Sequence, residues 1–223
     1  MRKSNLKIFF IPLLVVLLMM LPLSVKADIK SKDGEWHYIK LTDTTIEITG
    51  YLGSSTTLKI PETIDNLTVV RIGDRAFARS SKLSAIVIPD TVTEIGNEAF
   101  ANSYNLRAIS IPKTVSIIGT DAFLNTPYLT TLYGTAVDGV TYINTIAIHY
   151  DNSTPNVSLK YGTTSFGTIF RDATNLTSLT IPSTVTKIED FAFLGCNSLR
   201  YITIPDSVYE IGTAAFIGIN PNS

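Results

Sequence analysis

One repeated motif constrains the fold of this chain more than any other feature of its sequence. Residues 83–100 and 106–123 align without gaps, and residues 176–193 and 199–216 repeat the same pattern. Equivalent prolines in neighbouring copies are 23 residues apart. A single coil of this length cannot bury its own apolar edge, whereas stacked coils can, so the period predicts a solenoid.

Each position of the motif has a physical reading, which the copy at residues 106–123 illustrates. Ile109 and Ile111 alternate as a strand with one buried face requires, and Pro112 ends that strand because proline cannot donate a ladder hydrogen bond. Gly119 is expected to adopt a backbone angle that a side chain would forbid. Phe123 then points into the core after a small residue.

Phenylalanine is concentrated at one position of the repeat. Six of the eight Phe residues after residue 27 occupy it, namely Phe77, Phe100, Phe123, Phe170, Phe193 and Phe216. A column of this kind is typical of a stacked core and not of a cofactor site. Burying each ring contributes roughly 1.5–3 kcal/mol.

The repeat copies resemble the BspA-type (Treponema pallidum-type) leucine-rich repeat family. Its motif runs Leu-x-x-Leu-x-Ile-Pro-x-x-Val-x-x-Ile-Gly-x-x-Ala-Phe-x-x-Cys, and the resemblance covers about residues 44–219. It implies an α/β-type repeat solenoid with a parallel sheet on its concave face. It also implies a cell-surface adhesin that engages host matrix proteins, such as fibronectin and fibrinogen, or other bacteria. The Ile-Pro and Ile-Gly elements are missing from residues 129–175, and residues 189–191 replace one Gly turn.

The same patterns divide the chain into five segments. Residues 1–27 form a predicted signal peptide, and residues 28–57 an N-terminal β cap. Within that cap, residues 35–41 and 45–49 read as a β-hairpin that covers the open edge of the first coil. Regular repeats are predicted at 58–128 and again at 176–223, with degenerate repeats at 129–175 between them.

The N-terminus has the pattern of an export signal. Arg2, Lys3 and Lys7 precede an apolar run at residues 8–23, and small residues then favour cleavage before Asp28. The alternative is an uncleaved anchor, which the short run and its two prolines disfavour. We therefore expect a secreted or bacterial cell-surface protein with no membrane insertion after cleavage.

Charge and cysteine content exclude several partners. Removing the four basic residues of the first 27 lowers the net charge to about -5, whereas nucleic acid demands a basic surface. A single cysteine in an exported chain leaves no internal disulfide. The partner is therefore expected to be a protein, and stability is expected to come from packing.

No catalytic or metal-binding pattern is present. Cys196 lies in a column of small, inward residues and reads as a core filler, and neither His37 nor His149 has ligand spacing with it. Asp138 and Gly139 read as a turn, because no loop has the alternating acidic residues of a calcium site. The sequence therefore predicts no enzyme, no cofactor and no metal.

Candidate binding residues lie between the core positions of the predicted strands. They are rich in hydroxyls, and their Tyr and Arg side chains are the types that dominate interface energetics. The set, expected on the concave face, is Arg107, Ser110, Thr131, Tyr133, Ser178, Thr180, Arg200, Tyr201 and Thr203. Two alternatives stay open for it. Ser and Thr also suit a solvated strand face, and the tyrosine-rich segment 129–175 is a second candidate site.

A structural spacer, or a truncated fragment of a larger surface protein without its own ligand, is the alternative to a binding module. That reading rests on the absence of a recognisable cap pattern after Phe216.

Overall fold

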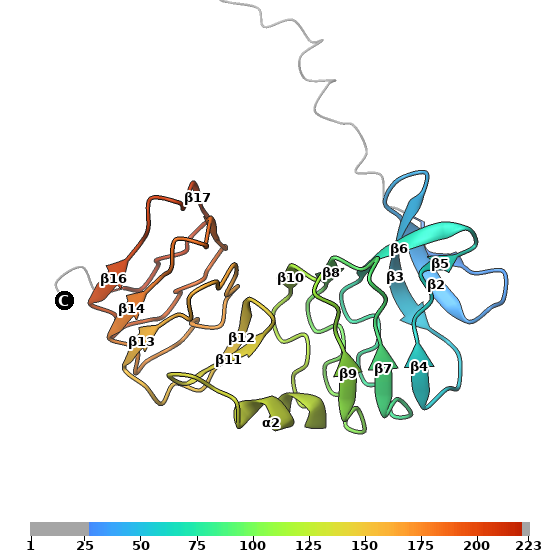
Figure 1. Ribbon diagram of the computed structural model, residues 1–223, viewed down its shortest axis with the longest axis horizontal. Helices are drawn as coiled ribbons and strands as arrows, with labels where there is room; N and C mark the ends of the chain where they lie inside the picture. Colours follow the sequence, from blue (N-terminus) through green and yellow to red (C-terminus); the bar gives the residue numbers. More distant parts are fainter. Residues whose placement is uncertain (1–26, 220–223) are drawn as a thin grey trace, which may run out of the picture.

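The computed structural model describes residues 27–219, which form a curved stack of coils (Figure 1). The predicted signal peptide lies outside the described residues except for Ala27, and its cleavage stays a prediction. Between residues 27 and 219, no helix has the length and apolar character needed to cross a membrane. The stack bends into an arc, and the hollow side of the arc opens away from α2 (Pro127–Tyr133).

A hairpin covers the first coil, as predicted. β1 (Ile29–Lys30), β2 (Trp36–Lys40) and β3 (Thr45–Tyr51) pair antiparallel in that order. β3 then pairs in parallel with β6 (Leu67–Ile72), which also carries the short antiparallel strand β5 (Thr63–Ile64). The edge of the first coil therefore has a hydrogen-bonded neighbour.

The first half of the solenoid has parallel strands on two sides. One sheet contains β4 (Thr57–Lys59), β7 (Ala85–Val87) and β9 (Ala108–Ser110). On the other side, β6 continues into β8 (Glu94–Ile95) and β10 (Ile117–Ile118). Each strand ends before the proline of its repeat or at the Gly turn, so the short strand lengths follow from the motif.

The second half repeats this arrangement with separate sheets. One contains β13 (Asn156–Ser158), β14 (Ser178–Thr180) and β16 (Tyr201–Thr203), all parallel. The other pairs β15 (Lys187–Ile188) with β17 (Glu210–Ile211). Neither sheet is continuous with those of the first half.

Between the halves, the structure corrects one expectation. Thr131 and Tyr133 were expected on a strand, but they lie in α2. Thr126 caps this helix by accepting a hydrogen bond from the Leu129 amide, and Pro127 occupies the first turn, where its missing N–H is not needed. An antiparallel hairpin of β11 (Val140–Ile143) and β12 (Ile146–Tyr150) follows.

The predicted Phe column is present as two stacks of three rings. Phe77, Phe100 and Phe123 stack with centroids 5.3 and 5.6 Å apart and with interplanar angles of 10° and 5°. Phe170, Phe193 and Phe216 form the second stack, at 6.0 and 5.1 Å. Each stack belongs to its own apolar cluster, so the molecule has two cores that meet at the junction.

The reason for the repeat glycine is not the one expected. Gly119 does not have a positive φ. A Cβ at Gly119 would lie 2.5 Å from the Asn97 amide nitrogen of the preceding coil, so close stacking excludes a side chain there. The positive φ angles of the turn occur two residues later, at Glu98 (52°) and Asp121 (55°) in successive coils.

Candidate functional site

The predicted binding residues fall into separate groups. Ser178 and Thr180 of β14 lie in register beside Tyr201 and Thr203 of β16, and Arg200 directly precedes that strand. We call these five residues the β14–β16 face. Tyr201 is 72% exposed. Its neighbour Arg200 is exposed too, and in the described part of the chain it forms no ion pair.

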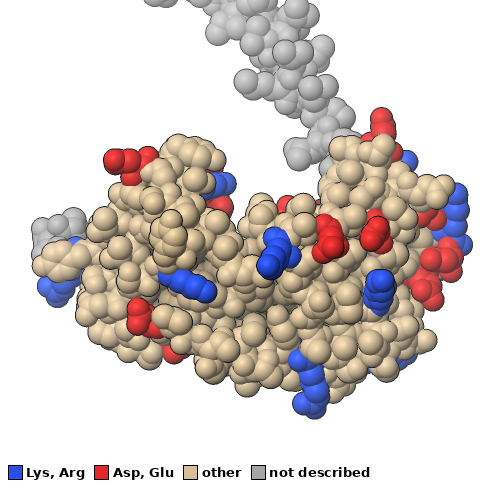
Figure 2. Space-filling model, viewed as in Figure 1, with Lys and Arg blue, Asp and Glu red and all other residues tan. Residues whose placement is uncertain are grey.

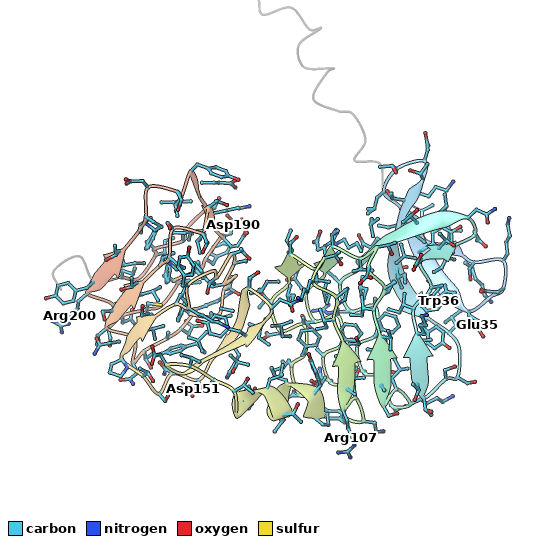
Figure 3. The ribbon with its side chains drawn as sticks, viewed as in Figure 1. Glu35, Trp36, Arg107, Asp151, Asp190 and Arg200 are labelled. Carbon is cyan, nitrogen blue, oxygen red and sulfur yellow. The ribbon has the colours of Figure 1, made fainter. Side chains whose placement is uncertain are left out.

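Arg107 and Ser110 belong to the other half, at β9. Figure 3 shows Arg107 at the lower margin of the molecule and Arg200 at its left end. The structure therefore does not bring these two arginines together, because α2 and the β11–β12 hairpin interrupt the sheets between them.

Tyr133 and Thr131 lie on helix α2 and not on a strand face. The Tyr133 ring lies over His149 of β12, with centroids 4.7 Å apart. Burial lowers the pKa of His149 from its ordinary value, so its imidazole is neutral near pH 7. Thr131 Oγ1 donates to the Tyr128 carbonyl within the helix.

A groove that the sequence did not reveal lies where the two halves meet. Its first wall is formed by residues 118–124, and its second by residues 166–169 and 171–172, with residues 147–150 of β12 also in the lining. We call it the junction groove. Its main part has a volume of about 310 Å³, and a smaller part of about 140 Å³ extends beside Tyr133. Thr120 and Thr168 join the two walls through hydroxyls 2.8 Å apart.

The groove continues into the hollow of the arc, which Figure 2 shows between the two halves with both signs of charge around it. On one side, the Arg71 guanidinium contacts Glu47 at 2.9 Å, Glu94 at 3.0 Å and Asp74 at 3.6 Å. Burial raises the pKa of Glu47, and this effect outweighs the opposing attraction of Arg71.

On the other side of the hollow, Lys187 takes the place of Arg71. Its ammonium lies 3.1 Å from Glu210 and 3.3 Å from Glu189, and the hydrogen bond to Glu210 is the main reason that its pKa is raised. Glu189 occupies the position that is Gly in most copies.

Cys196 is a core residue, as its column indicated. It is fully buried, and its thiol donates to the Phe170 carbonyl at 2.8 Å. Ser103 makes the equivalent bond to the Phe77 carbonyl. Burial raises the pKa of Cys196 to about 11, so the thiol stays protonated and unreactive near pH 7. Within residues 27–219, no three His, Cys, Asp or Glu side chains are grouped to hold a metal ion.

Two exposed aromatic residues were missed because they precede or follow the strands. Tyr104 and Tyr209 are 66% and 79% exposed, whereas Tyr161, which is 86% exposed, lies in the tyrosine-rich segment that the sequence singled out. The only signal in the sequence was that none of them falls at a core position of the repeat.

Comparisons with known proteins agree with the coil architecture. The family model described as BspA type leucine rich repeat region matches residues 36–154 and 163–223 in six copies. The solved structure of a T. pallidum leucine rich repeat protein is 26% identical, covers 84% of this chain and 89% of that chain, and has a TM-score of 0.46. A leucine rich cell surface protein from Faecalibacterium prausnitzii is 20% identical over 86% of this chain and 80% of that chain, with a TM-score of 0.38. No curated protein matches the chain. Because the family model covers most of the sequence in the same coils that the structure displays, the chain belongs to the BspA-type leucine-rich repeat family.

Proposed function

We propose that this chain is an exported surface protein that binds a protein partner through its β14–β16 face. The observation that carries the proposal is the register of this face. Ser178 pairs with Tyr201 and Thr180 with Thr203, so four of the predicted side chains form one patch on adjacent strands. Arg200 extends the same patch.

The chemistry of the patch favours a protein over other ligands. An exposed Tyr beside an exposed Arg supplies the residue types that most often dominate protein interfaces. Ser178 Oγ is held by Asn156 Oδ1 at 2.7 Å, so part of the hydroxyl surface is already ordered before binding. The acidic charge of residues 28–223 disfavours nucleic acid. Host matrix proteins such as fibronectin and fibrinogen are the partners that the family resemblance implies.

Export rests on the N-terminal pattern of residues 1–27 and on no structural observation. Immunoblotting of cell fractions is its test. We expect the protein in the medium or at the cell surface, and protein confined to the cytoplasm would contradict this part of the proposal.

Surface plasmon resonance against a panel of matrix proteins and glycans tests the binding face. Replacing Arg200 and Tyr201 together by Ala should weaken saturable binding roughly tenfold or more. Tyr209→Ala is the matched control, because Tyr209 is as exposed as Tyr201 but precedes β17 on the other side of the coil. If no panel member binds, the structural spacer becomes the better account.

A further inference from the structure

Within residues 27–219, the first wall of the junction groove is a backbone edge that lacks a hydrogen-bonded neighbour. In the regular coils, the amides of alternate turn residues donate to the carbonyls of the next coil. Glu98, Phe100 and Asn102 donate in this way to Thr120, Ala122 and Leu124 at 2.9, 2.8 and 2.7 Å. The same three bonds link the preceding pair of coils and the last pair. This ladder is therefore the standard contact between coils.

The ladder stops at the groove. Asp121, Phe123 and Asn125 are the next residues in the series, but among residues 27–219 no acceptor receives their amide hydrogens. The local geometry is nevertheless retained, since Asp121 and Asn125 keep the positive φ angles of 55° and 57° that their equivalents have. Asp121 and Phe123 both line the groove. A backbone N–H that lies beside an apolar surface without a hydrogen-bond acceptor costs free energy. A ligand that supplies an acceptor is therefore favoured there.

The spacing of these donors fits one kind of occupant. Two amides that point the same way from alternate residues match the carbonyls of an extended peptide, which also recur every second residue. Main-chain pairing to an exposed edge is a general way to bind such a peptide. Sugars and phosphate groups do not present acceptors with this repeat.

The charges that line the groove and the adjoining hollow favour a positively charged peptide. Their lining has five carboxylates against three basic side chains, and all three bases, Arg71, Arg171 and Lys187, are already paired with acids. Asp121 forms no ion pair within the described residues and lies at the donor edge itself. The carboxylates are Glu94, Asp121, Asp172, Glu189 and Asp190.

We propose that the junction groove binds a short, extended, Lys- or Arg-bearing segment of a partner protein by main-chain pairing to Asp121 and Phe123. This inference rests on the proposed binding function and assigns a second contact to the same kind of partner. The basic side chain pairs with Asp121, and the peptide carbonyls accept from the amides of Asp121 and Phe123.

Amide hydrogen exchange followed by NMR tests the proposal on the purified protein. The probes are the peptides acetyl-TVKVTV-amide and acetyl-TVEVTV-amide. Saturating TVKVTV should slow exchange at Asp121 and Phe123 about tenfold or more, because these amides gain acceptors. Exchange at Glu98 and Phe100 should stay unchanged, since both already donate to the next coil. Exchange unchanged at Asp121 and Phe123 at millimolar TVKVTV would overturn the proposal.

A charge variant provides the second readout. Asp121→Asn should weaken TVKVTV binding roughly 2- to 5-fold, as expected for an exposed ion pair, and should not weaken TVEVTV binding. Asp206→Asn is the control, because Asp206 is exposed and lies outside the groove lining. Equal affinity for the two peptides in the unaltered protein would also count against the proposal.

The matrix-protein binding experiment and the peptide experiment can succeed or fail independently of each other. Loss of matrix-protein binding in the Arg200 and Tyr201 variant, together with no peptide effect at the groove amides, would leave the surface function in place and reject the groove as a site. Slowed exchange at those amides would support the groove whether or not the β14–β16 face binds a panel member.

Discussion

Replacing Phe100 by Ala tests the stacked-ring core most directly. Phe100 is the central ring of the first stack and is fully buried between Phe77 and Phe123. Truncating a buried Phe removes its transfer free energy and leaves a cavity, which together reduce the free energy of unfolding by about 3–5 kcal/mol. The neighbouring rings belong to adjacent coils and are held by the ladder, so they have little freedom to collapse into the space.

Urea denaturation followed by tryptophan fluorescence is a suitable assay. Trp36 is the single tryptophan, is buried, and lies 6.5 Å from Phe77 between ring centroids, so it reports on the core that Phe100 helps to form. With a slope near ~2 kcal/mol per molar urea, the midpoint of unfolding should fall by about 1.5–2.5 M. Tyr104→Ala is the control. Its side chain is 66% exposed, so it should change stability by less than ~0.5 kcal/mol.

A loss below ~1 kcal/mol for Phe100→Ala would refute the stacked-ring account. Such a result would mean that the coils are held by their backbone ladders, with the aromatic column filling space without contributing strongly. If Tyr104→Ala reduced the free energy of unfolding as much as Phe100→Ala does, the assay would be responding to something other than side-chain burial.

Three further predictions follow from the same geometry. Phe193→Ala should destabilise the second core. The free energy of unfolding reported by Trp36 fluorescence should stay within ~0.5 kcal/mol of its original value, because the two cores are separate. An equal loss in the Trp36 signal would contradict their independence. Gly96→Ala should destabilise by more than ~1 kcal/mol in thermal or urea unfolding, since its Cβ would overlap the preceding coil, whereas Gly134→Ala, with open space around it, should be neutral or slightly stabilising. The Cys196 thiol should not react with a disulfide reagent at pH 8 in the folded protein, because its pKa of about 11 keeps it protonated well above that pH. After denaturation the thiol should react. Rapid reaction of the native protein would show that the site is open.

The regular coils could be predicted because every position of their motif serves one local purpose. Alternating Ile residues before a proline define the strand, and the Phe column defines the core. Both occur in the structure where the 23-residue register places them. The glycine position was recognised, but its cause was not. Close approach to a neighbouring coil is a contact between residues far apart in sequence, which one coil considered alone does not contain.

The junction could not be predicted for a related reason. Residues 127–133 contain β-favouring Thr and Tyr, and the repeat register assigned them to a strand, but the Thr126 cap and Pro127 start a helix instead. Once that coil is lost, the backbone edge at Asp121 and Phe123 has no acceptor among residues 27–219, and the groove opens. The groove therefore forms at the place where the repeat register loses a regular coil. Of the predicted binding residues, those on β14 and β16 come together, whereas Tyr133 meets His149, a pairing that no repeat position suggested.

The interruption between the two halves also has a mechanical consequence. A continuous ladder distributes a pulling or bending load over many parallel hydrogen bonds, as the coils on either side of the junction do. At the junction, the load passes through the α2 connection, the hairpin and a few side-chain contacts such as that between Thr120 and Thr168. Bending stiffness is therefore lowest there. A force applied across the two halves, as when a tethered molecule is pulled by its partner, would widen or close the groove before it disturbed either core.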